Sequence, residues 1–199
     1  MASKERIQRL KEETRTNILT AALQIVKEEG WQALSLRKIA DLIEYTAPII
    51  YEYFTNKEAI LLELTRQGYK LLFTQIQEAK SKHRLPAKQL EAMWMAYWNF
   101  AFAEKEYYQI MYGVEMNCCA VQKSLGEAKW PANLFLDVIR DLAKGKNATE
   151  DELCMWYYTY WSIVHGLISI NIVRIGTTDE INRQILKNAI AGIARSITD

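Results

Sequence analysis

The sequence predicts an all-α protein of about nine helices, with a three-helix N-terminal domain followed by a larger helical bundle. Only three prolines and eight glycines interrupt its 199 residues. Apolar residues recur at helical spacing, and no segment shows the alternation of a half-buried strand. Half of the chain is hydrophobic and a quarter is charged, which is typical of a globular protein. We place the domain boundary between 1–56 and 57–199.

The first predicted helix runs from about residue 4 to residue 29. Its apolar stripe consists of Ile18, Ala22, Ile25 and Val26. Gly30 is a natural left-handed stop for this helix, because glycine has no Cβ to oppose a positive φ.

Two short helices follow it. Ser35 is expected to cap a helix over 36–43, and Thr46 to cap another over 47–54. Pro48 is acceptable in the first turn of the latter, where its missing N–H is not needed.

The remaining helices are marked by prolines and capping boxes. Thr55 and Glu58 form one such box, which starts a helix from residue 57 to about residue 82. Thr149 with Glu152, and Thr177 with Glu180, form two more. The other predicted helices cover 86–104, 107–112, 131–145, 150–174 and 178–196. Some helix is also expected within 113–129.

Two short helices joined by a three-residue turn and braced by a longer helix are the arrangement of a helix-turn-helix. In the second of them, Ile50 and Phe54 face inward at i and i+4. The outer face then consists of Ala47, Pro48, Ile49, Tyr51 and Glu52, with Tyr53 on its flank. Methyl groups and phenols can lie against thymine methyls, and tyrosine hydroxyls can donate to phosphates. This face is therefore a candidate DNA-binding surface.

The candidate helix has no basic residue, so positive charge must come from around it. The net charge of +1, from 25 basic and 24 acidic residues, gives no sign of a nucleic-acid partner by itself. The neighbouring cations are Lys4, Arg6, Arg9, Lys11, Arg15, Arg37, Lys38 and Lys57. The alternative is that these are ordinary solvated charges, diluted by Glu5, Glu12 and Glu13.

Residues 18–64 resemble the DNA-binding domain of the tetracycline-repressor (TetR) family. The shared pattern is a helix ending in Gly30, then Ser-Leu-Arg-Lys-Ile-Ala from Ser35, then Ile-Tyr-x-Tyr-Phe-x-x-Lys-Glu from Ile50. The resemblance implies a dimeric transcriptional regulator, usually a repressor, whose third helix enters the major groove of a palindromic operator. It also implies an effector site in the C-terminal domain.

Carried over by position, the resemblance implies phosphate contacts from Ser35, Tyr51 and Lys57. It implies base or sugar contacts from Arg37, Thr46, Ala47, Pro48 and Ile49. The sequence departs from the family pattern at Pro48, at Glu52 and at Glu44, where the family often has a turn glycine. A glutamate in a left-handed turn costs roughly 1 kcal/mol relative to glycine.

The C-terminal domain is rich in aromatic residues, which mark a candidate effector site. Its candidate ligand-binding residues are Trp94, Tyr97, Trp98, Phe102, Tyr108, Met111, Trp161 and His165. Such stripes are more often core than pocket, but rigid rings readily leave a cavity with a few polar tips. An apolar or aromatic effector is expected, and ring faces could also hold a cation.

The segment from Trp161 to Gly166 resembles the Trp-His-Gly (WHG) element of one C-terminal subgroup of the family. His165 could face the pocket, cap a buried polar group or lie at a dimer seam.

The last two helices are apolar on more than one side. In the final helix the stripe is Ile181, Ile185, Ala189, Ile193 and Ile197. If one face serves the bundle, the other can pair with a second subunit, which predicts a homodimer with a four-helix seam.

Enzyme motifs are absent from the sequence: there is no HExxH, Cys-x-x-Cys, Walker loop or GxGxxG after a strand. We therefore expect no catalytic residue, no metal and no cofactor. The polar N-terminus and the lack of a long apolar run predict a cytoplasmic protein, with Cys118, Cys119 and Cys154 as reduced thiols. The alternative function is a helical ligand-binding or protein-interaction protein whose helix-turn-helix does not bind DNA.

Overall fold

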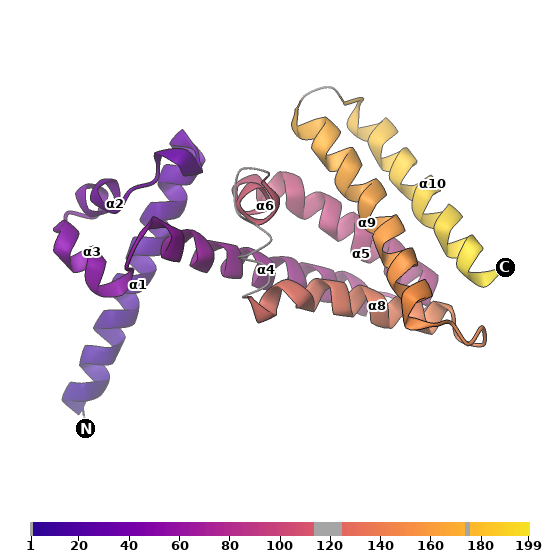
Figure 1. Cartoon of the computed structure of the whole chain (residues 1–199), viewed down its shortest axis with the longest axis horizontal. Coiled ribbons are helices and arrows are strands. Elements are labelled where there is room, and N and C mark those ends of the chain that lie inside the picture. The colour runs from indigo at the N-terminus through magenta and orange to yellow at the C-terminus, as the bar shows by residue number, and fades with distance from the viewer. Residues whose placement is uncertain (1, 114–124, 174–175) are drawn as a thin grey trace. The chain divides into compact units, whose positions relative to one another are not determined.

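A computed structural model describes residues 2–113, 125–173 and 176–199, and every regular element within these ranges is a helix (Figure 1). The predicted all-α fold of nine α-helices is thus confirmed for the described residues. The chain forms two compact units, one of residues 1–68 and 106–121 and the other of residues 69–105 and 122–199. The domain boundary placed at residues 56 and 57 stays a prediction.

The first unit is built around the helix-turn-helix. Its elements are α1 (Ala2–Glu29), the short 3-10 helix η1 (Trp31–Ala33), α2 (Leu36–Leu42), α3 (Ala47–Tyr53), the start of α4 (Lys57–Ser81) and nearly all of α6 (Lys105–Tyr112). One apolar core joins them, and its central members are Ile18, Ile25, Ile39, Ile50, Phe54, Ile60, Leu64 and Ile110. All four residues of the stripe predicted for the first helix are buried, as expected.

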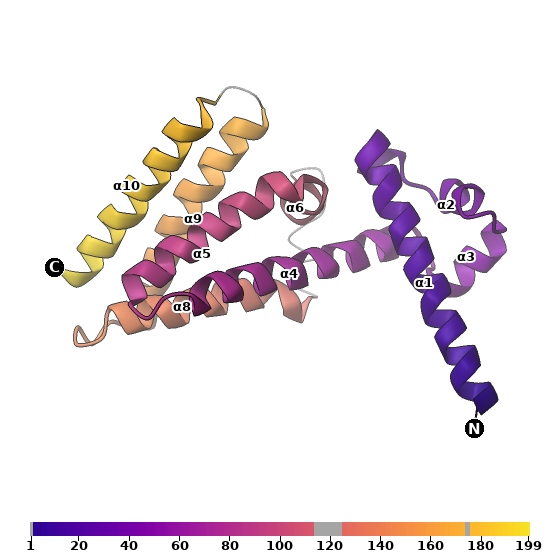
Figure 2. The ribbon, with the colours of Figure 1, turned by 180° about the vertical axis from the view of Figure 1, so that it is seen from behind.

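The second unit is a helical bundle with an aromatic core. Its elements are the rest of α4, α5 (Pro86–Ala103), the 3-10 helix η2 (Gly126–Lys129), α8 (Trp130–Leu142), α9 (Glu150–Ile172) and α10 (Asp179–Thr198). Its fully buried side chains include Trp94, Phe100, Phe135, Tyr160, Val164 and Leu186. Helices α9 and α10 pack along each other, as both ribbon views show (Figures 1 and 2).

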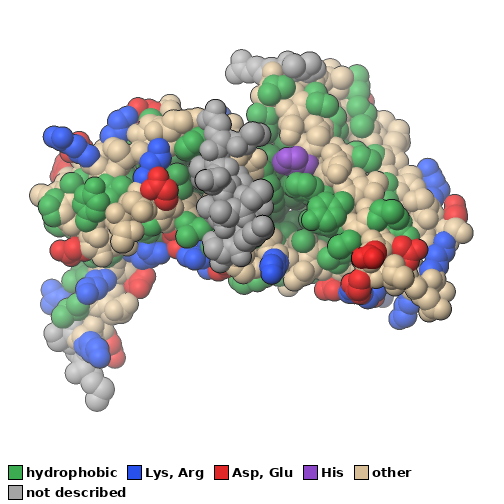
Figure 3. Space-filling view, viewed as in Figure 1, with side chains coloured by type: hydrophobic (Ala, Val, Ile, Leu, Met, Phe, Trp, Pro, Cys, Tyr) green, Lys and Arg blue, Asp and Glu red, His purple; other side chains and the backbone are tan. Residues whose placement is uncertain are grey.

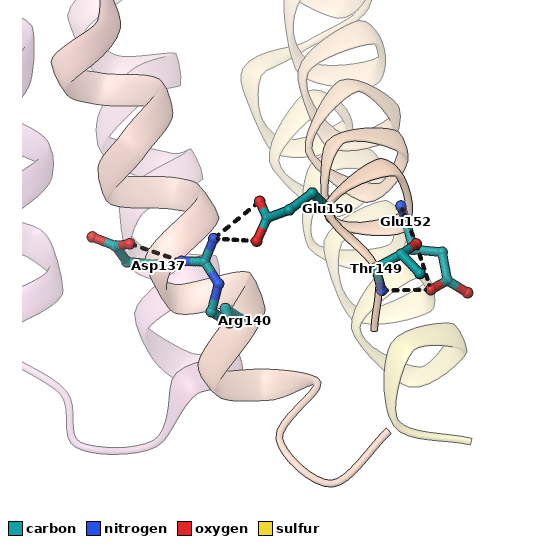
Figure 4. Close-up of polar contacts among 5 residues, drawn as sticks. All are labelled: Asp137, Arg140, Thr149, Glu150 and Glu152. Atoms are coloured by element: carbon teal, nitrogen blue, oxygen red, sulfur yellow. Dashed lines mark hydrogen bonds and ion pairs between the residues drawn. The ribbon is translucent and has the colours of Figure 1, made fainter. Parts of the chain in front are cut away.

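The capping box predicted at the start of α9 is confirmed. The Thr149 side chain accepts from the Glu152 N–H, and the Glu152 carboxylate accepts from the Thr149 N–H at 2.8 Å (Figure 4). The N–H and the hydroxyl of Thr149 both donate to this carboxylate, and these two bonds lower the pKa of Glu152. Next to it, Arg140 of α8 reaches Glu150 at 3.2 Å and Asp137 at 3.2 Å. This corner therefore fixes the entry of the chain into α9.

The other two predicted capping boxes are wrong by one residue. Asn56, not Thr55, caps α4 by accepting from the Ala59 N–H at 2.8 Å. Thr178, not Thr177, caps α10 by accepting from the Ile181 N–H. The Thr177 hydroxyl instead donates to the buried Asn182 side chain at 3.1 Å. When two possible capping residues are adjacent, the sequence alone does not show which of them caps the helix.

Some expectations fall partly outside the described ranges. Of the segment 113–129, residues 126–129 form a 3-10 helix, while 114–124, with Cys118 and Cys119, lie outside the described residues, as does the predicted end at Arg174. Cys154 is exposed.

The described helices include none long and apolar enough to cross a bilayer. Among the same residues, no three His, Cys, Asp or Glu side chains gather as a metal site would need.

Candidate DNA-binding face and effector region

The outer face of α3, which is made of Ala47, Pro48, Ile49, Tyr51 and Glu52, is accessible. Tyr51 is 57% exposed, and Pro48 and Glu52 are exposed as well. Ala47 and Ile49 are half-buried, as is Tyr53 on the flank. On the opposite side, Ile50 and Phe54 are buried in the core, as the i and i+4 spacing predicted. Helical periodicity thus divides α3 into a core side and an open side.

The turn before α3 adopts the left-handed geometry expected of it. Glu44 has a φ of 57°, and its N–H donates to the Asp41 carbonyl at 3.4 Å. The Tyr45 N–H donates to the Ala40 carbonyl at 2.9 Å. These two bonds form a Schellman motif that ends α2, with glutamate at the position usually taken by glycine. The direction in which α3 leaves α2 therefore depends on a strained residue.

The two predicted caps of the helix-turn-helix differ. The Ser35 Oγ accepts from the Lys38 N–H at 3.2 Å and so caps α2. Thr46 lies at the cap position of α3, but its exposed side chain makes no capping bond. Its hydroxyl is not committed to the helix and can donate to, or accept from, a DNA group. Arg37, in the first turn of α2, is also exposed.

Lys57 is held by the chain itself. Its Nζ donates to the Gln32 carbonyl at 2.9 Å and lies 5.3 Å from the centre of the Trp31 ring. These contacts tie the start of α4 to η1. An ammonium has three N–H donors, so a phosphate contact remains chemically available.

Two other cations around α3 also have internal partners. Arg15 pairs with Glu63 at 2.9 Å and stacks over the Phe54 ring, 4.6 Å from its centre. Lys38 pairs with Glu29 at 2.6 Å. These ion pairs reduce the positive charge that Arg15 and Lys38 offer to DNA.

A groove between α1 and α3 was not foreseen from the sequence. It has a volume of about 260 Å³ and is lined by Gln8, Lys11, Glu12, Arg15, Glu52 and Tyr53.

The aromatic residues predicted on α5 mostly form a packed core. Trp94, Tyr97 and Trp98 are buried. Trp94 stacks on Phe135 with ring centres 3.8 Å apart and on Tyr160 at 5.7 Å. Within the described part of the chain, its indole Nε1 is the buried side-chain polar atom without a hydrogen-bond partner. A buried donor without an acceptor is unusual, because its desolvation is uncompensated.

Trp161 and His165 of α9 form a second group next to this core. The Trp161 Nε1 donates to the Tyr97 hydroxyl at 3.0 Å, and its ring stacks on His165 with centres 4.8 Å apart. Both residues are half-buried, and burial lowers the pKa of His165. The imidazole therefore favours its neutral form, which suits an apolar environment.

The other three predicted effector residues lie in different surroundings. Phe102, near the end of α5, is 41% exposed and contacts the Trp98 ring at 4.7 Å. Tyr108 and Met111 are buried in the first compact unit rather than the second. The eight residues do not all belong to one unit, and their joint role in binding stays a prediction.

One side of α9 and α10 carries exposed apolar residues. On α9 these are Met155, Tyr158, Ile163 and Ile170, and on α10 they are Ile181 and Ile185. Cβ atoms added at Gly166 of α9 or Gly192 of α10 would meet no atom within 4 Å. The predicted stripe of the final helix is thus divided, with Ile197 buried and its first two residues exposed.

Known family models match both parts of the chain. The family described as "Bacterial regulatory proteins, tetR family" matches residues 18–64. That described as "Tetracyclin repressor-like, C-terminal domain" matches residues 90–183, so that more than half of the chain is matched. The chain belongs to the TetR family. It is a transcriptional regulator rather than an enzyme, and the family implies DNA binding and dimerisation. Assignment to the Trp-His-Gly subgroup stays a prediction.

Individual relatives agree with this assignment. The uncharacterised HTH-type transcriptional regulator YuxN of Bacillus subtilis is 32% identical over 69 residues, which are 35% of this chain but only 24% of that protein. A protein of unknown function from Rhodococcus sp. RHA1 has a similar structure, with a TM-score of 0.77 and 17% identity over 93% of this chain and 95% of that one. The TetR family regulator PfmR from Thermus thermophilus has a TM-score of 0.66 and is 17% identical, over 89% of this chain and 97% of that one. Both structures share the fold of this TetR chain.

Proposed function

We propose that this TetR regulator is a repressor that binds a palindromic operator as a homodimer and is controlled by an apolar or aromatic small molecule. The observation that carries the DNA-binding part is the open outer face of α3, held away from the core by the buried Ile50 and Phe54. The repressor role rests on the family resemblance. A protein that acts on an operator works where the chromosome lies, which is the cytoplasm in bacteria.

In this proposal α3 enters the major groove. Ala47, Pro48 and Ile49 contact base or sugar edges, and the Thr46 hydroxyl, which the helix cap does not use, adds a polar contact. Ser35, Tyr51 and Lys57 contact phosphates, Arg37 contacts a base or sugar edge, and Tyr53 lies on the flank of the α3 face. Phosphate contacts set the position of the helix, while the α3 face sets the sequence preference.

The test uses duplexes selected by the wild-type chain from a random pool. Tyr51→Phe removes one exposed hydroxyl and is expected to weaken binding about two- to tenfold, the effect of losing one hydrogen bond. Ser81→Ala removes the hydroxyl of an exposed residue in the other unit, outside α9 and α10, and serves as the control. Equal affinity of the Tyr51 variant, the control and the wild type would contradict the proposed contact.

The homodimer is proposed to form through α9 and α10. Exposed apolar residues on both helices support this, because a large exposed apolar patch usually marks an interface. Glycine within a helix costs about 1 kcal/mol against alanine, yet nothing in the same unit occupies the space beside Gly166 or Gly192. Close approach by helices of a second subunit gives both glycines a physical reason.

The effector is proposed to bind beside the aromatic groups of the second unit, near Trp98, Trp161 and His165. The Trp94 indole, which lacks an acceptor, supports a ligand that carries an oxygen or nitrogen acceptor. A screen of apolar and aromatic compounds by tryptophan fluorescence tests this, with Trp161→Phe as the variant expected to lose most of the response. A flat response across a broad library would count against the site.

A second candidate function is a helical ligand-binding or interaction protein whose helix-turn-helix does not bind DNA. The exposed Glu52 and the glutamate at position 44 favour it, because carboxylates repel phosphates. Failure of the wild-type chain to enrich any duplex from the random pool would favour this candidate.

A further inference from the structure

The second unit has a cavity at the end of the bundle where α5 begins and where α8 and α10 end. These three helices pack against one another, and both ribbon views place these helix ends together (Figures 1 and 2). The cavity, here named the end cavity, has a volume of about 440 Å³, which lies within the range of small-molecule sites. Its lining contains none of the aromatic residues proposed to surround the effector. It is therefore a separate hollow in the same unit.

The inner part of the end cavity is apolar. Ile190 and Ala194 of α10 line it and are buried, and the half-buried Leu142 of α8 lies with them. Ala191 adds a methyl group from an exposed position on α10. Hydrocarbon placed against these side chains leaves water, which is favourable in proportion to the apolar area removed.

The outer part of the end cavity is positively charged. Its charged lining residues are the three cations Lys88, Lys187 and Arg195 and the carboxylate of Glu91, so its net charge is 3 − 1 = +2, where the whole chain has +1. Lys88 pairs with Glu91 at 2.8 Å. In the part of the chain that the structure describes, neither Lys187 nor Arg195 pairs with a carboxylate. Figure 3 shows Lys and Arg side chains at this end of the second unit, at the right of the view, with some carboxylates beside them.

The end cavity lies on a different side of α10 from the proposed dimer seam. Lys187, Ala191 and Arg195 are four residues apart and so share one side of the helix. Ile185 and Gly192, seven residues apart, share another. Consecutive helix residues are about 100° apart, so Ala191 and Gly192 point in different directions. The cavity therefore stays open when two copies of the chain pair through the seam.

We propose that the end cavity is a second small-molecule site, which binds an organic anion with an apolar body, such as a carboxylate on a hydrocarbon chain. The anionic group pairs with Lys187 and Arg195, and the hydrocarbon lies against Leu142, Ile190 and Ala194. The guanidinium of Arg195 can donate two parallel N–H bonds to one carboxylate. The inference is independent of the proposed DNA binding and of the proposed effector site among the aromatic residues.

The experiment measures the binding of three ten-carbon probes to the full chain by isothermal titration calorimetry. Decanoate, decanol and decylamine have the same chain length and differ in the charge of one end. The wild type should bind decanoate at least about tenfold more tightly than decanol, as expected for a charge-assisted hydrogen bond, and decylamine most weakly. Raising the salt concentration should weaken the binding of decanoate and leave that of decanol nearly unchanged.

Two charge-matched double variants locate the anionic group. Lys187→Gln/Arg195→Gln should lose the preference for decanoate over decanol while keeping its affinity for decanol. Lys144→Gln/Lys146→Gln removes the same charge from exposed positions that follow α8 and do not line the cavity, and it should keep the preference.

Two single variants locate the apolar body. Ala191→Trp places a large ring in the cavity from an exposed position and should weaken the binding of both decanoate and decanol. Trp161→Phe, among the aromatic residues, should leave the affinity for decanoate unchanged. Thermal unfolding followed by circular dichroism verifies that each variant is folded, and if Ala191→Trp is not, the two charge variants still decide the outcome.

Four results would overturn the proposal. The first is a wild-type chain that does not bind decanoate, or binds it no better than decanol. The second is an equal loss of preference in the two double variants, because the overall charge of the unit would then be the cause. The third is a loss of decanoate binding in Trp161→Phe, which would place the anion among the aromatic residues. The fourth is unchanged binding by a folded Ala191→Trp variant.

Discussion

Replacing Glu44 with glycine should stabilise the helix-turn-helix. Glu44 has a φ of 57°, a conformation in which a Cβ meets its own backbone at a cost of roughly 1–2 kcal/mol. Glycine removes that cost, but it also gives the unfolded chain more conformational freedom, which lowers the free energy of unfolding by about 0.4–1 kcal/mol. The expected net gain in the free energy of unfolding is about 1 kcal/mol. For a chain of this size, that raises the melting temperature by about 2–4 °C.

The control separates backbone strain from charge. Glu44→Ala removes the carboxylate but keeps the Cβ, so it should leave the free energy of unfolding within about 0.5 kcal/mol of the wild type. Urea unfolding followed by circular dichroism gives the free energy, and a thermal scan gives the melting temperature. Equal stabilisation by alanine and glycine would refute the argument from φ, because charge would then be the cause. Destabilisation by glycine would refute it as well.

Three further outcomes follow from the second unit. Gly192→Leu should fold like the wild type, because a Cβ there meets no atom within 4 Å. The variant should nevertheless shift the dimer towards monomer in analytical ultracentrifugation. Lys187→Leu, at an exposed position elsewhere on α10, should leave the dimer unchanged. Burial lowers the pKa of His165, so the unfolded chain binds its proton more readily, and stability should be full above about pH 6.5 and fall as the pH drops below it. His165→Gln should flatten this dependence in melting temperatures from pH 5 to 8, whereas the same change at the exposed His83 should not. Thr149→Ala should destabilise α9 by about 1 kcal/mol in urea unfolding, through loss of the capping box.

The fold and the two sides of α3 could be predicted because local rules decide them. Helical spacing separates Ile50 and Phe54 from Tyr51, and the structure divides them in the same way. Gly30, at a φ of 85°, ends α1 as predicted, and Glu44 takes the left-handed turn despite its side chain. In each case the information lies within a few residues of the feature.

The missed features depend on residues far apart in the sequence. The bond from Lys57 to the Gln32 carbonyl spans 25 residues, and the pair between Arg15 and Glu63 joins α1 to α4. No local pattern shows that these cations have internal partners. Phe102 has the spacing of a core residue but is 41% exposed, because no other described helix covers it, and the sequence near it does not show this. Which residues bind DNA or an effector stays a prediction for the same reason.

In the proposed complex the outer face of α3 meets DNA twice, once from each subunit of the dimer. A footprint of the wild-type chain on a duplex that it selected from a random pool tests this most directly. We expect two protected half-sites related by a two-fold axis, about 35 Å or a multiple of it apart, whose protection is lost when Tyr51 is replaced by alanine. A single protected site, or protection that survives Tyr51→Ala unchanged, would contradict it.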